Sequence, residues 1–501
     1  MHRRTTDIKN YSRRIALFLA AAFVCCPLLG CESLGLVAPK KNPVSDKIEF
    51  DQEYYDSLEG IEKIEYERSL LNDSVPEELF FDGQTFGILC SSEDSINDWQ
   101  PEEQTGDRLN DAIHDMNQYV EDRLNIKLVY LAASDKADDL IAIDDKTYSI
   151  VTDDYKTIGW YAADGMLRDW ETMPHMNLDA PWWNQSAREA VQVAGRSYLM
   201  VGASNIQEVR VTYCVYFNKA LVEKYKSVMP DLYGLVDSGQ WTLDKFIELS
   251  RIGYIDLNGN QEEDLRDQYG LAAQTTSYAV PFLYSCGETT TARDENGLPY
   301  IKMNNEKMVS LTEKVFELIY GHPAVYPTRD WSTHSDIFAE GRAMFMYGTF
   351  AHALMGYFSE MKDPYGFLPY PKWDELQQNY YTITDPSGSA FGIMLNSSND
   401  DMTGAVMEVM NARAWKHVQP ALYEAALKGR KADTADDARM IDLINRGVVY
   451  DFGYVFGGPG ELLSKMMTHR TKDYYSQYRS RLRDWEHNLE GVVDMILEAE
   501  G

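Results

Sequence analysis

Cysteine is scarce in this 501-residue chain, and its positions show no pairing pattern. Cys25 and Cys26 lie in an apolar N-terminal run. Cys90, Cys214 and Cys286 each lie in an apolar or small-residue stretch, without the spacing of a metal site. The sequence therefore indicates neither a disulfide framework nor a zinc site. It predicts instead that the last three cysteines are buried free thiols.

The chain also has few positively charged residues relative to its negatively charged ones. The chain carries 47 Lys and Arg residues against 79 Asp and Glu residues, a formal net charge of -32. Such a field repels phosphate backbones and anionic lipid surfaces, so nucleic acid is not an expected partner. The chain is nevertheless 44% hydrophobic and 12% aromatic, which excludes an acidic disordered protein. Its length is enough for two or more lobes.

The motifs of common enzyme classes are missing as well. The sequence contains no GxSxG elbow, HExxH helix, Walker loop or GxGxxG turn, and its His residues show no metal-ligand spacing. We therefore do not expect an enzyme. One catalytic alternative stays open, because an anchored extracellular glycoside hydrolase needs only two carboxylates at a set separation, which a sequence does not show.

The N-terminus has the pattern of an export signal. The basic stretch MHRRTTDIKNYSRR is followed by the apolar run IALFLAAAFVCCPLLG, as in signal peptides. The apolar core is shorter than the roughly 20 residues of a membrane-spanning helix. Leu28-Leu29-Gly30-Cys31 resembles the bacterial lipobox, which implies a lipoprotein signal peptide over residues 1–30 and lipidation of Cys31. We expect a mature protein anchored at the extracellular face of the cell membrane.

An α/β rhythm begins near residue 84, after a membrane tether and accessory segment predicted over residues 31–80. The runs QTFGILC, IKLVYLA and YSIVTDD have the composition of buried strands. Residues 107–123 follow a helical period. Strands that alternate with helices predict a largely parallel α/β sheet. Ligands of such sheets bind at the carboxyl ends of strands, where SSEDSINDW and TDDYKTIGW fall.

The segment DLNGNQEEDLRD has the ligand spacing of a calcium loop. The ligand positions are Asp256, Asn258, Asn260, Glu262 through its carbonyl, Asp264 and Asp267. Position six is Gln261, where glycine usually provides a positive φ, and position twelve is Asp instead of the longer Glu. An acidic, solvated turn is the alternative to a structural calcium site. In either case the loop is expected to brace the fold and not to catalyse, and no cofactor is required.

Six further segments occur in a fixed order: GMLRDWETM, LDAPWWNQ, VYFNKALVEKY, SGQWTLDKFIELS, FAEGRAMFMYG and FLPYPKWDE. Together they resemble segments of the extracellular solute-binding proteins, family 1, of ABC importers. The resemblance implies an α/β fold: a bilobal, periplasmic-binding-protein-like (type II) clamp whose two lobes are joined by hinge strands. Lobe one would comprise residues 80–213 and 385–450, and lobe two residues 214–384 and 451–501.

The resemblance also implies a function. Such a chain, expected to be a monomer, captures a mono- or oligosaccharide by hinge closure and delivers it to ABC permease subunits. The 10 Trp and 33 Tyr residues suit sugar rings, which offer an apolar face and a rim of hydroxyls. The acidic field of the chain leaves a peptide, a polyamine or another non-sugar solute as an alternative cargo.

Eight residues are predicted to bind the ligand: Asp94, Trp99, Asp153, Asp154, Trp160, Arg210, Tyr278 and Phe350. Both tryptophans follow carboxylates in predicted loops. The resemblance implies cleft contacts for Asp94, Asp154 and Arg210, and sugar stacking for Tyr278 and Phe350. Core packing is the competing interpretation for each aromatic residue, because large aromatic side chains dominate protein cores.

Overall fold

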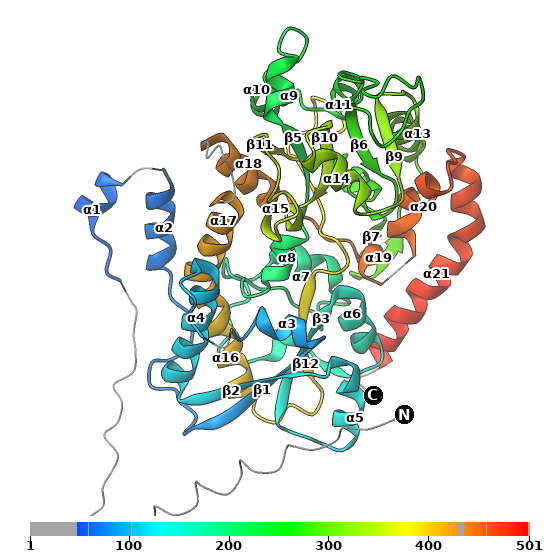
Figure 1. The fold of residues 1–501 in the computed structure, drawn as a ribbon. Helices are drawn as coiled ribbons and strands as arrows, with labels where there is room; N and C mark the ends of the chain where they lie inside the picture. Colours follow the sequence, from blue (N-terminus) through cyan, green and yellow to red (C-terminus); the bar gives the residue numbers. More distant parts are fainter. Residues whose placement is uncertain (1–47, 59, 102, 429–434, 457, 499–501) are drawn as a thin grey trace, which may run out of the picture. The chain divides into compact units, whose positions relative to one another are not determined.

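The computed structural model describes residues 48–501 except 59, 102, 429–434, 457 and 499–501. The predicted signal peptide and the lipidation predicted at Cys31 lie outside the described residues. Among the residues that are described, no helix has the length and apolar composition needed to cross a membrane. Two five-stranded sheets organise this part of the chain (Figure 1).

The first sheet is built around the strands that the sequence predicts. In spatial order its strands are β2 (Ile126–Ala132), β1 (Gln84–Cys90), β3 (Tyr148–Asp154), β12 (Ser389–Met394) and β4 (Leu167–Arg168). β1 pairs in parallel with β2 and β3, as the α/β rhythm predicts. β12 pairs antiparallel with β3 and β4, because the chain enters this sheet a second time from the opposite direction. The sheet is therefore mixed.

Helices pack on both faces of this first sheet. α4 (Arg108–Leu124) begins at the N-cap Asp107, whose carboxylate accepts backbone hydrogen bonds. Its predicted apolar face, which includes Ile113, packs with α16 (Asp400–Arg413) in one core. α6 (Tyr155–Ala163) belongs to a separate core against β3 and β12. Burial from both sides explains why β1 and β3 are nearly continuous apolar runs.

The second sheet comes from the middle of the sequence. In spatial order its strands are β11 (Tyr365–Leu368), β5 (Tyr213–Asn218), β10 (Ala343–Thr349), β6 (Tyr269–Gln274) and β9 (Val325–Thr328). β5 is antiparallel to β10 and β11, whereas β6 is parallel to β10 and β9. The nearby helix α11 (Leu243–Ser250) begins at the N-cap Thr242, whose side chain accepts from the N–H of Lys245, and packs on α13 (Glu306–Tyr320).

Three chain segments pass between the two sheets. A β-bridge joins Thr212, just before β5, to Thr384, and a second bridge joins Thr382 to Val448. The N–H of Thr382 also donates to the carbonyl of Gly447 at 2.9 Å. The three segments therefore lie side by side. A small set of paired residues between two packed lobes is where a hinge motion is absorbed.

Two C-terminal helices pack differently from the lobe boundaries that the resemblance implies. Residues 385–450 are assigned to lobe one on the resemblance, yet α18 (Ala435–Arg446) packs on β11 and buries Ile444 in the core of the second sheet. α21 (Tyr474–Glu498) packs on that core near its start and reaches a core of the first sheet through Ile496. α18 therefore belongs with the second sheet, whereas α21 touches both cores and cannot be assigned to one lobe.

Cys90, Cys214 and Cys286 are buried free thiols, as predicted. Burial raises the pKa of Cys90 and the pKa of Cys286 to about 12. Because the thiolate is the reactive form, these thiols are inert at neutral pH.

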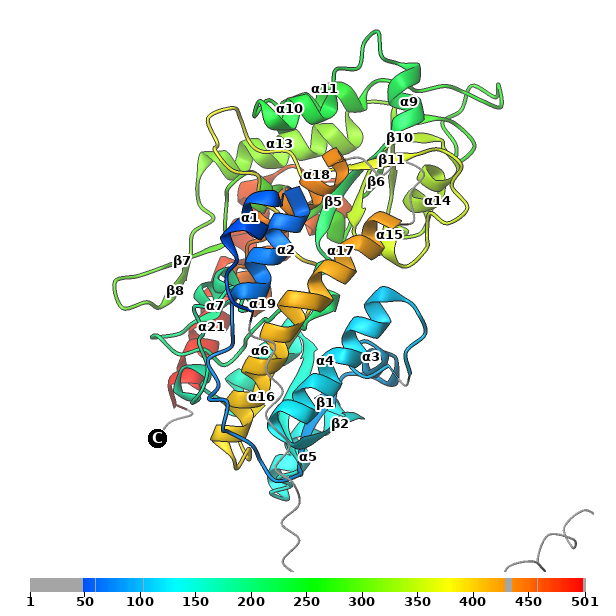
Figure 2. The same ribbon diagram turned by 90° about the vertical axis from the view of Figure 1, so that its left-hand side faces the viewer.

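The end of the predicted accessory segment docks on the helices of the first sheet. α2 (Gly60–Leu70) lies beside the π-helical turn Ala414–Val418 (Figure 2). The guanidinium of Arg68 lies 5.1 Å from the ring centroid of Trp415. Arg123 of α4 is buried and donates to the backbone carbonyls of Val75, Pro76, Glu77 and Leu79. One guanidinium therefore binds four backbone carbonyls of the segment that precedes β1 and holds this segment against α4.

Replacement of Arg123 by Ala is expected to lower the free energy of unfolding by about 2–4 kcal/mol, because four backbone carbonyls lose a buried, charged donor. Urea unfolding at neutral pH measures this loss. Lys127→Ala is the matched control, since Lys127 is an exposed cation on the adjoining strand β2. Equal stabilities of the two variants would contradict the anchoring role of Arg123.

Candidate functional site

A pocket of 680 Å³ opens at the carboxyl ends of β1 and β3. Small-molecule sites usually have volumes of about 300–1,000 Å³. The parallel pairing of β1 with β3 places the loops that follow both strands at one edge of the sheet. The short helix α3 (Glu93–Asn97), the helix α8 (Ile206–Arg210) and the loop before β12 complete most of the wall.

Five of the eight predicted ligand residues line this pocket: Asp94, Trp99, Asp153, Asp154 and Arg210. The acid-rich loops SSEDSINDW and TDDYKTIGW therefore meet at the edge where strand order places them. The signal in the sequence is a polar, acidic turn directly after a buried strand. Contact of these five residues with a ligand stays a prediction.

Two neighbouring aspartates of the pocket are held in place by hydrogen bonds. The carboxylate of Asp153 accepts from the hydroxyl of Ser134 at 2.5 Å and from the N–H of Asp154 at 2.7 Å. Burial raises the pKa of Asp153. Asp154 caps α6 and accepts from the N–H groups of Lys156 at 3.0 Å and Thr157 at 3.1 Å. Both side chains are therefore oriented before a ligand arrives, which reduces the entropic cost of binding.

The pocket is acidic because both of its cations are paired. Arg210 Nη1 lies 2.6 Å from Asp98 Oδ1, and Lys156 Nζ lies 2.5 Å from Glu461 Oε1. Asp94 is exposed and has no hydrogen-bond partner within the described part of the chain. Its carboxylate is therefore available to accept from a hydroxyl or an ammonium group of a ligand.

Three predicted ligand residues do not line the pocket. Trp160 lies on α6 with 46% of its surface exposed, outside the pocket wall. Phe350 is only 1% exposed and packs on Phe367, with ring centroids 5.4 Å apart. Tyr278 is half-buried, and its ring centroid lies 5.4 Å from that of Tyr213. Core packing, the competing interpretation, accounts for the position of Phe350, so this structure offers no exposed ring for sugar stacking there.

Several lining residues were not predicted from the sequence. Gln207 of α8 reaches the pocket beside Arg210, and Ser387 reaches it from the loop before β12. Met355, 63% exposed, follows α15 (Ala351–Leu354) and comes from the second sheet's side of the molecule. The loop PSGS before the strand run SAFGIM is the one available signal for Ser387. Nothing in the sequence marks Met355.

A buried carboxyl group connects the pocket wall to the segments between the sheets. Glu208 of α8 accepts a hydrogen bond from the hydroxyl of Tyr450. The hydroxyl of Tyr155 lies 3.0 Å from that of Thr384, which is the residue bridged to Thr212. Burial raises the pKa of Glu208 to about 8. The carboxyl is therefore protonated at neutral pH, at the place where the three crossing segments meet.

The predicted calcium loop, residues 256–267, folds around Asp264. The side-chain amides of Asn258 and Asn260 donate to Asp264 Oδ2 at 3.1 and 2.9 Å. Gln261 has a φ of 62°, so position six adopts the positive φ that usually selects glycine. Among the described residues, no three His, Cys, Asp or Glu side chains form a cluster that could hold a metal ion. A calcium ion here would therefore depend on amide and backbone oxygens as much as on carboxylates.

No protein-family model and no curated protein matches the sequence. Solved structures match the fold. A cyclo/maltodextrin-binding protein complexed with maltotetraose shares 14% sequence identity, covers 83% of this chain and 97% of its own, and gives a TM-score of 0.52. The ABC substrate-binding protein Lmo0181 from Listeria monocytogenes in complex with cycloalternan shares 14% identity over 84% of this chain and 100% of its own, with a TM-score of 0.49. UgpB from Mycobacterium tuberculosis in complex with glycerophosphocholine shares 15% identity, covers 78% of this chain and 96% of its own, and gives a TM-score of 0.46.

Two sheets joined by three crossing segments, together with the match at a TM-score of 0.52, define the fold class. The chain has the bilobal, type II periplasmic-binding-protein-like fold. This confirms the fold class that the sequence resemblance implies. A shared fold at this level of identity does not assign a ligand, which depends on the site.

Replacement of Glu208 by Gln is expected to stabilise the protein relative to wild type progressively as the pH rises from 5 to 8. The folded protein holds the Glu208 proton up to about pH 8, whereas the unfolded chain releases it near 4.5. Wild-type stability therefore falls across this window, by at most about 1.4 kcal/mol per pH unit, and the amide cannot ionise. Melting temperatures of both proteins across the window measure the difference.

The matched control for this experiment is Glu189→Gln, because Glu189 is an exposed carboxylate of the same lobe. Its melting temperature should track that of wild type at every pH. A constant offset between Glu208→Gln and wild type from pH 5 to 8 would show that Glu208 does not titrate in this window.

Proposed function

We propose that this chain is the extracellular solute-binding component of an ABC importer and that it captures a mono- or oligosaccharide in the 680 Å³ pocket. The observation that carries the proposal is the convergence of Asp94, Asp153 and Asp154 with Trp99 at the carboxyl ends of two parallel strands. Carboxylates accept hydrogen bonds from sugar hydroxyls. Trp99 is 4% exposed and packs on Phe391 with ring centroids 5.3 Å apart, so the carboxylates, and not a free aromatic face, carry the proposal. A solved structure with the same fold is complexed with maltotetraose.

Closure of the two lobes supplies the transport signal in this proposal. Met355 approaches the pocket from the second sheet's side, whereas Asp94 and Asp154 belong to the first. A solute that contacts both sides stabilises the closed form over the open form. ABC permease subunits then recognise that form and accept the solute unchanged. No chemical step is assigned to the protein.

Export and anchoring complete the proposed role. The signal peptide of residues 1–30 would direct the chain out of the cell, and the lipid on Cys31 would hold it at the membrane. Residues 31–80 would act as the tether. The contacts of Arg123 with the carbonyls of Val75 and Pro76 would attach the end of this tether to lobe one. The protein would act as a monomer.

A cationic solute, such as a polyamine or a basic peptide, is the second candidate. The pairing of Arg210 and Lys156 with carboxylates leaves Asp94, Asp153 and Asp154 without a balancing charge in the pocket. Such a pocket attracts positive charge. A thermal-shift screen across sugars, peptides and polyamines separates the two classes. Mass spectrometry of the recovered ligand tests the hydrolase alternative, because a cleaved sugar would show catalysis.

Replacement of Asp94 by Ala is expected to weaken the binding of the sugar that the screen identifies by about 10-fold or more, because a hydrogen bond to a charged group contributes about 1.5–3 kcal/mol. Titration calorimetry measures the affinity. Asp164→Ala is the matched control, since Asp164 is an exposed carboxylate at the end of α6, away from the pocket. If both variants bind like wild type, the pocket is not the sugar site.

We also propose that the loop of residues 256–267 binds calcium as a structural brace. The ligands would be Asp256, Asn258, Asn260, the carbonyl of Glu262, Asp264 and Asp267. The proposal is supported by the gathering of Asn258 and Asn260 around Asp264 and by the positive φ of Gln261. Arg266 opposes it, because its guanidinium lies 2.6 Å from Asp264 and lowers the pKa of that carboxyl.

The melting temperature is expected to be higher in excess calcium than in EDTA, because an ion that binds only the folded state stabilises it by mass action. The variant Asp264→Asn should lose most of this difference. Identical melting temperatures in calcium and in EDTA, with no heat of calcium binding, would reduce the loop to a solvated acidic turn.

A further inference from the structure

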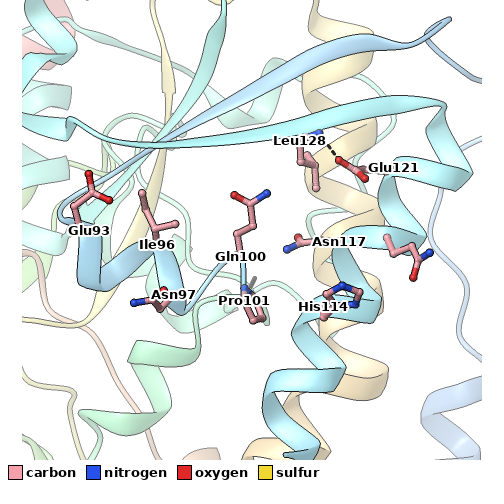
Figure 3. A pocket seen from close by; sticks show the side chains of 10 residues that line it. Glu93, Ile96, Asn97, Gln100, Pro101, His114, Asn117, Glu121 and Leu128 are labelled. Carbon is pink, nitrogen blue, oxygen red and sulfur yellow. Dashed lines mark hydrogen bonds between the residues drawn. The ribbon is translucent and has the colours of Figure 1, made fainter. Parts of the chain in front are cut away.

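A second pocket lies on the other side of α3 (Figure 3). It has a volume of 610 Å³ and is bounded by α3, α4 and the first half of β2. This volume also falls within the range of about 300–1,000 Å³ for small-molecule sites. None of the eight predicted ligand residues lines it.

α3 forms a thin wall between the two pockets. Asp94 and Ser95 line the first pocket, whereas Glu93 and Asn97 line the second. No residue of α3 is buried. The alternation continues past the helix, because Trp99 lines the first pocket and Gln100 the second. α3 therefore presents polar side chains to both cavities and buries no apolar face of its own.

The far wall of the second pocket is held in place by hydrogen bonds. The side-chain amide of Asn117 donates to the carbonyl of Trp99 at 2.5 Å, and its oxygen accepts from the hydroxyl of Tyr130 at 2.9 Å. The carboxylate of Glu121 accepts from the N–H of Leu128 at 2.8 Å (Figure 3). These contacts fix the distance between α4 and the loop after α3. The cavity therefore does not depend on mobile side chains.

Other polar groups of the second pocket lack partners. Gln100 and Gln118 are exposed, and their side-chain amides have no hydrogen-bond partner within the described part of the chain. His114 Nδ1 is buried without a hydrogen bond, and the nearest charged group is the carboxylate of Asp115 at 3.8 Å. A buried polar atom without a partner is rare and requires an explanation, such as a ligand or water that supplies the bond. Figure 3 shows the Gln100 side chain between α3 and α4, facing Asn117.

The lining of the second pocket favours a neutral, hydroxyl-rich group. It contains no Lys or Arg, so it offers nothing to an anion. Its carboxamides both donate and accept hydrogen bonds, as sugar hydroxyls do. Ile96, Pro101 and Leu128 provide apolar surface for the C–H groups of a ring. Two carboxylates, Glu93 and Glu121, also line the pocket, and Glu121 accepts from the N–H of Leu128. Carboxylates accept hydrogen bonds from sugar hydroxyls as well.

We propose that this second pocket binds an additional sugar unit of an oligosaccharide whose other units occupy the first pocket, with the oligosaccharide running past the C-terminal end of α3. The inference rests on the proposed sugar-binding function and deepens it: the protein prefers oligomers long enough to reach both sides of α3. Affinity therefore rises with the number of sugar units until the second pocket is filled.

The test uses titration calorimetry of the full mature chain with linear malto-, cello-, xylo- and manno-oligosaccharides of two to six units. In the series that binds, Gln100→Ala and Gln118→Ala should each weaken the binding of the longest oligomer by about 5-fold, the equivalent of one neutral hydrogen bond. The same variants should bind the shortest oligomer like wild type. Gln84→Ala, at an exposed glutamine of β1, is the matched control and should bind every length like wild type.

The outcomes separate this inference from the proposed function. Suppose that wild type binds a series, but that Gln100→Ala and Gln118→Ala either keep wild-type affinity for the longest oligomer or lose affinity equally for all lengths. Such a result would contradict the second subsite and leave the proposed role of the first pocket intact. If Asp94→Ala weakens all lengths while the glutamine variants weaken only the long ones, both pockets are used as proposed. If no oligosaccharide binds, the result contradicts the proposed sugar-binding function and, with it, the second subsite.

Discussion

The parallel pairing of β1 with β3 is the constraint on which the site depends. Ile88 lies opposite Ile150 and Leu89 opposite Val151, so the two strands end at the same edge of the sheet. Because both strands are buried by helices on both faces, a shift of register by one residue would move each apolar side chain from one core to the other and disrupt the packing of both. The serines and aspartates that follow the strands are therefore forced together, and the apolar sequence of each strand indirectly fixes the geometry of the polar pocket.

The second constraint is the way in which the chain returns to the first sheet. β12 must run antiparallel beside β3, and this places the loop before β12 against the pocket. The bridges from Thr212 to Thr384 and from Thr382 to Val448 hold the crossing segments together. Few residues connect the lobes there, so the energetic cost of a hinge motion is concentrated in this strip. A protonated Glu208 in the same strip makes its stability sensitive to pH.

Local patterns predict those parts of the fold that depend on local physics. Strand composition and helical periodicity identify β1, β3 and α4, and the acidic turns after two buried strands identify Asp94 and Asp154 as pocket residues. Contacts between segments that are far apart in the sequence have no local pattern from which they could be predicted. Met355 reaches the pocket only because the second sheet folds back beside the first, and Phe350, five residues earlier, is buried in the core. For the same reason, sequence position does not reveal that α18 packs on the second sheet or that α21 also reaches a core of the first.

The central claim is that the two lobes close on a solute in the first pocket and release it unchanged. Small-angle X-ray scattering of the mature protein, with and without a saturating amount of the oligosaccharide that binds it, tests closure most directly. The account predicts a smaller radius of gyration in the bound state, because a solute that contacts both lobes favours the closed form. An unchanged radius of gyration at full saturation would contradict it.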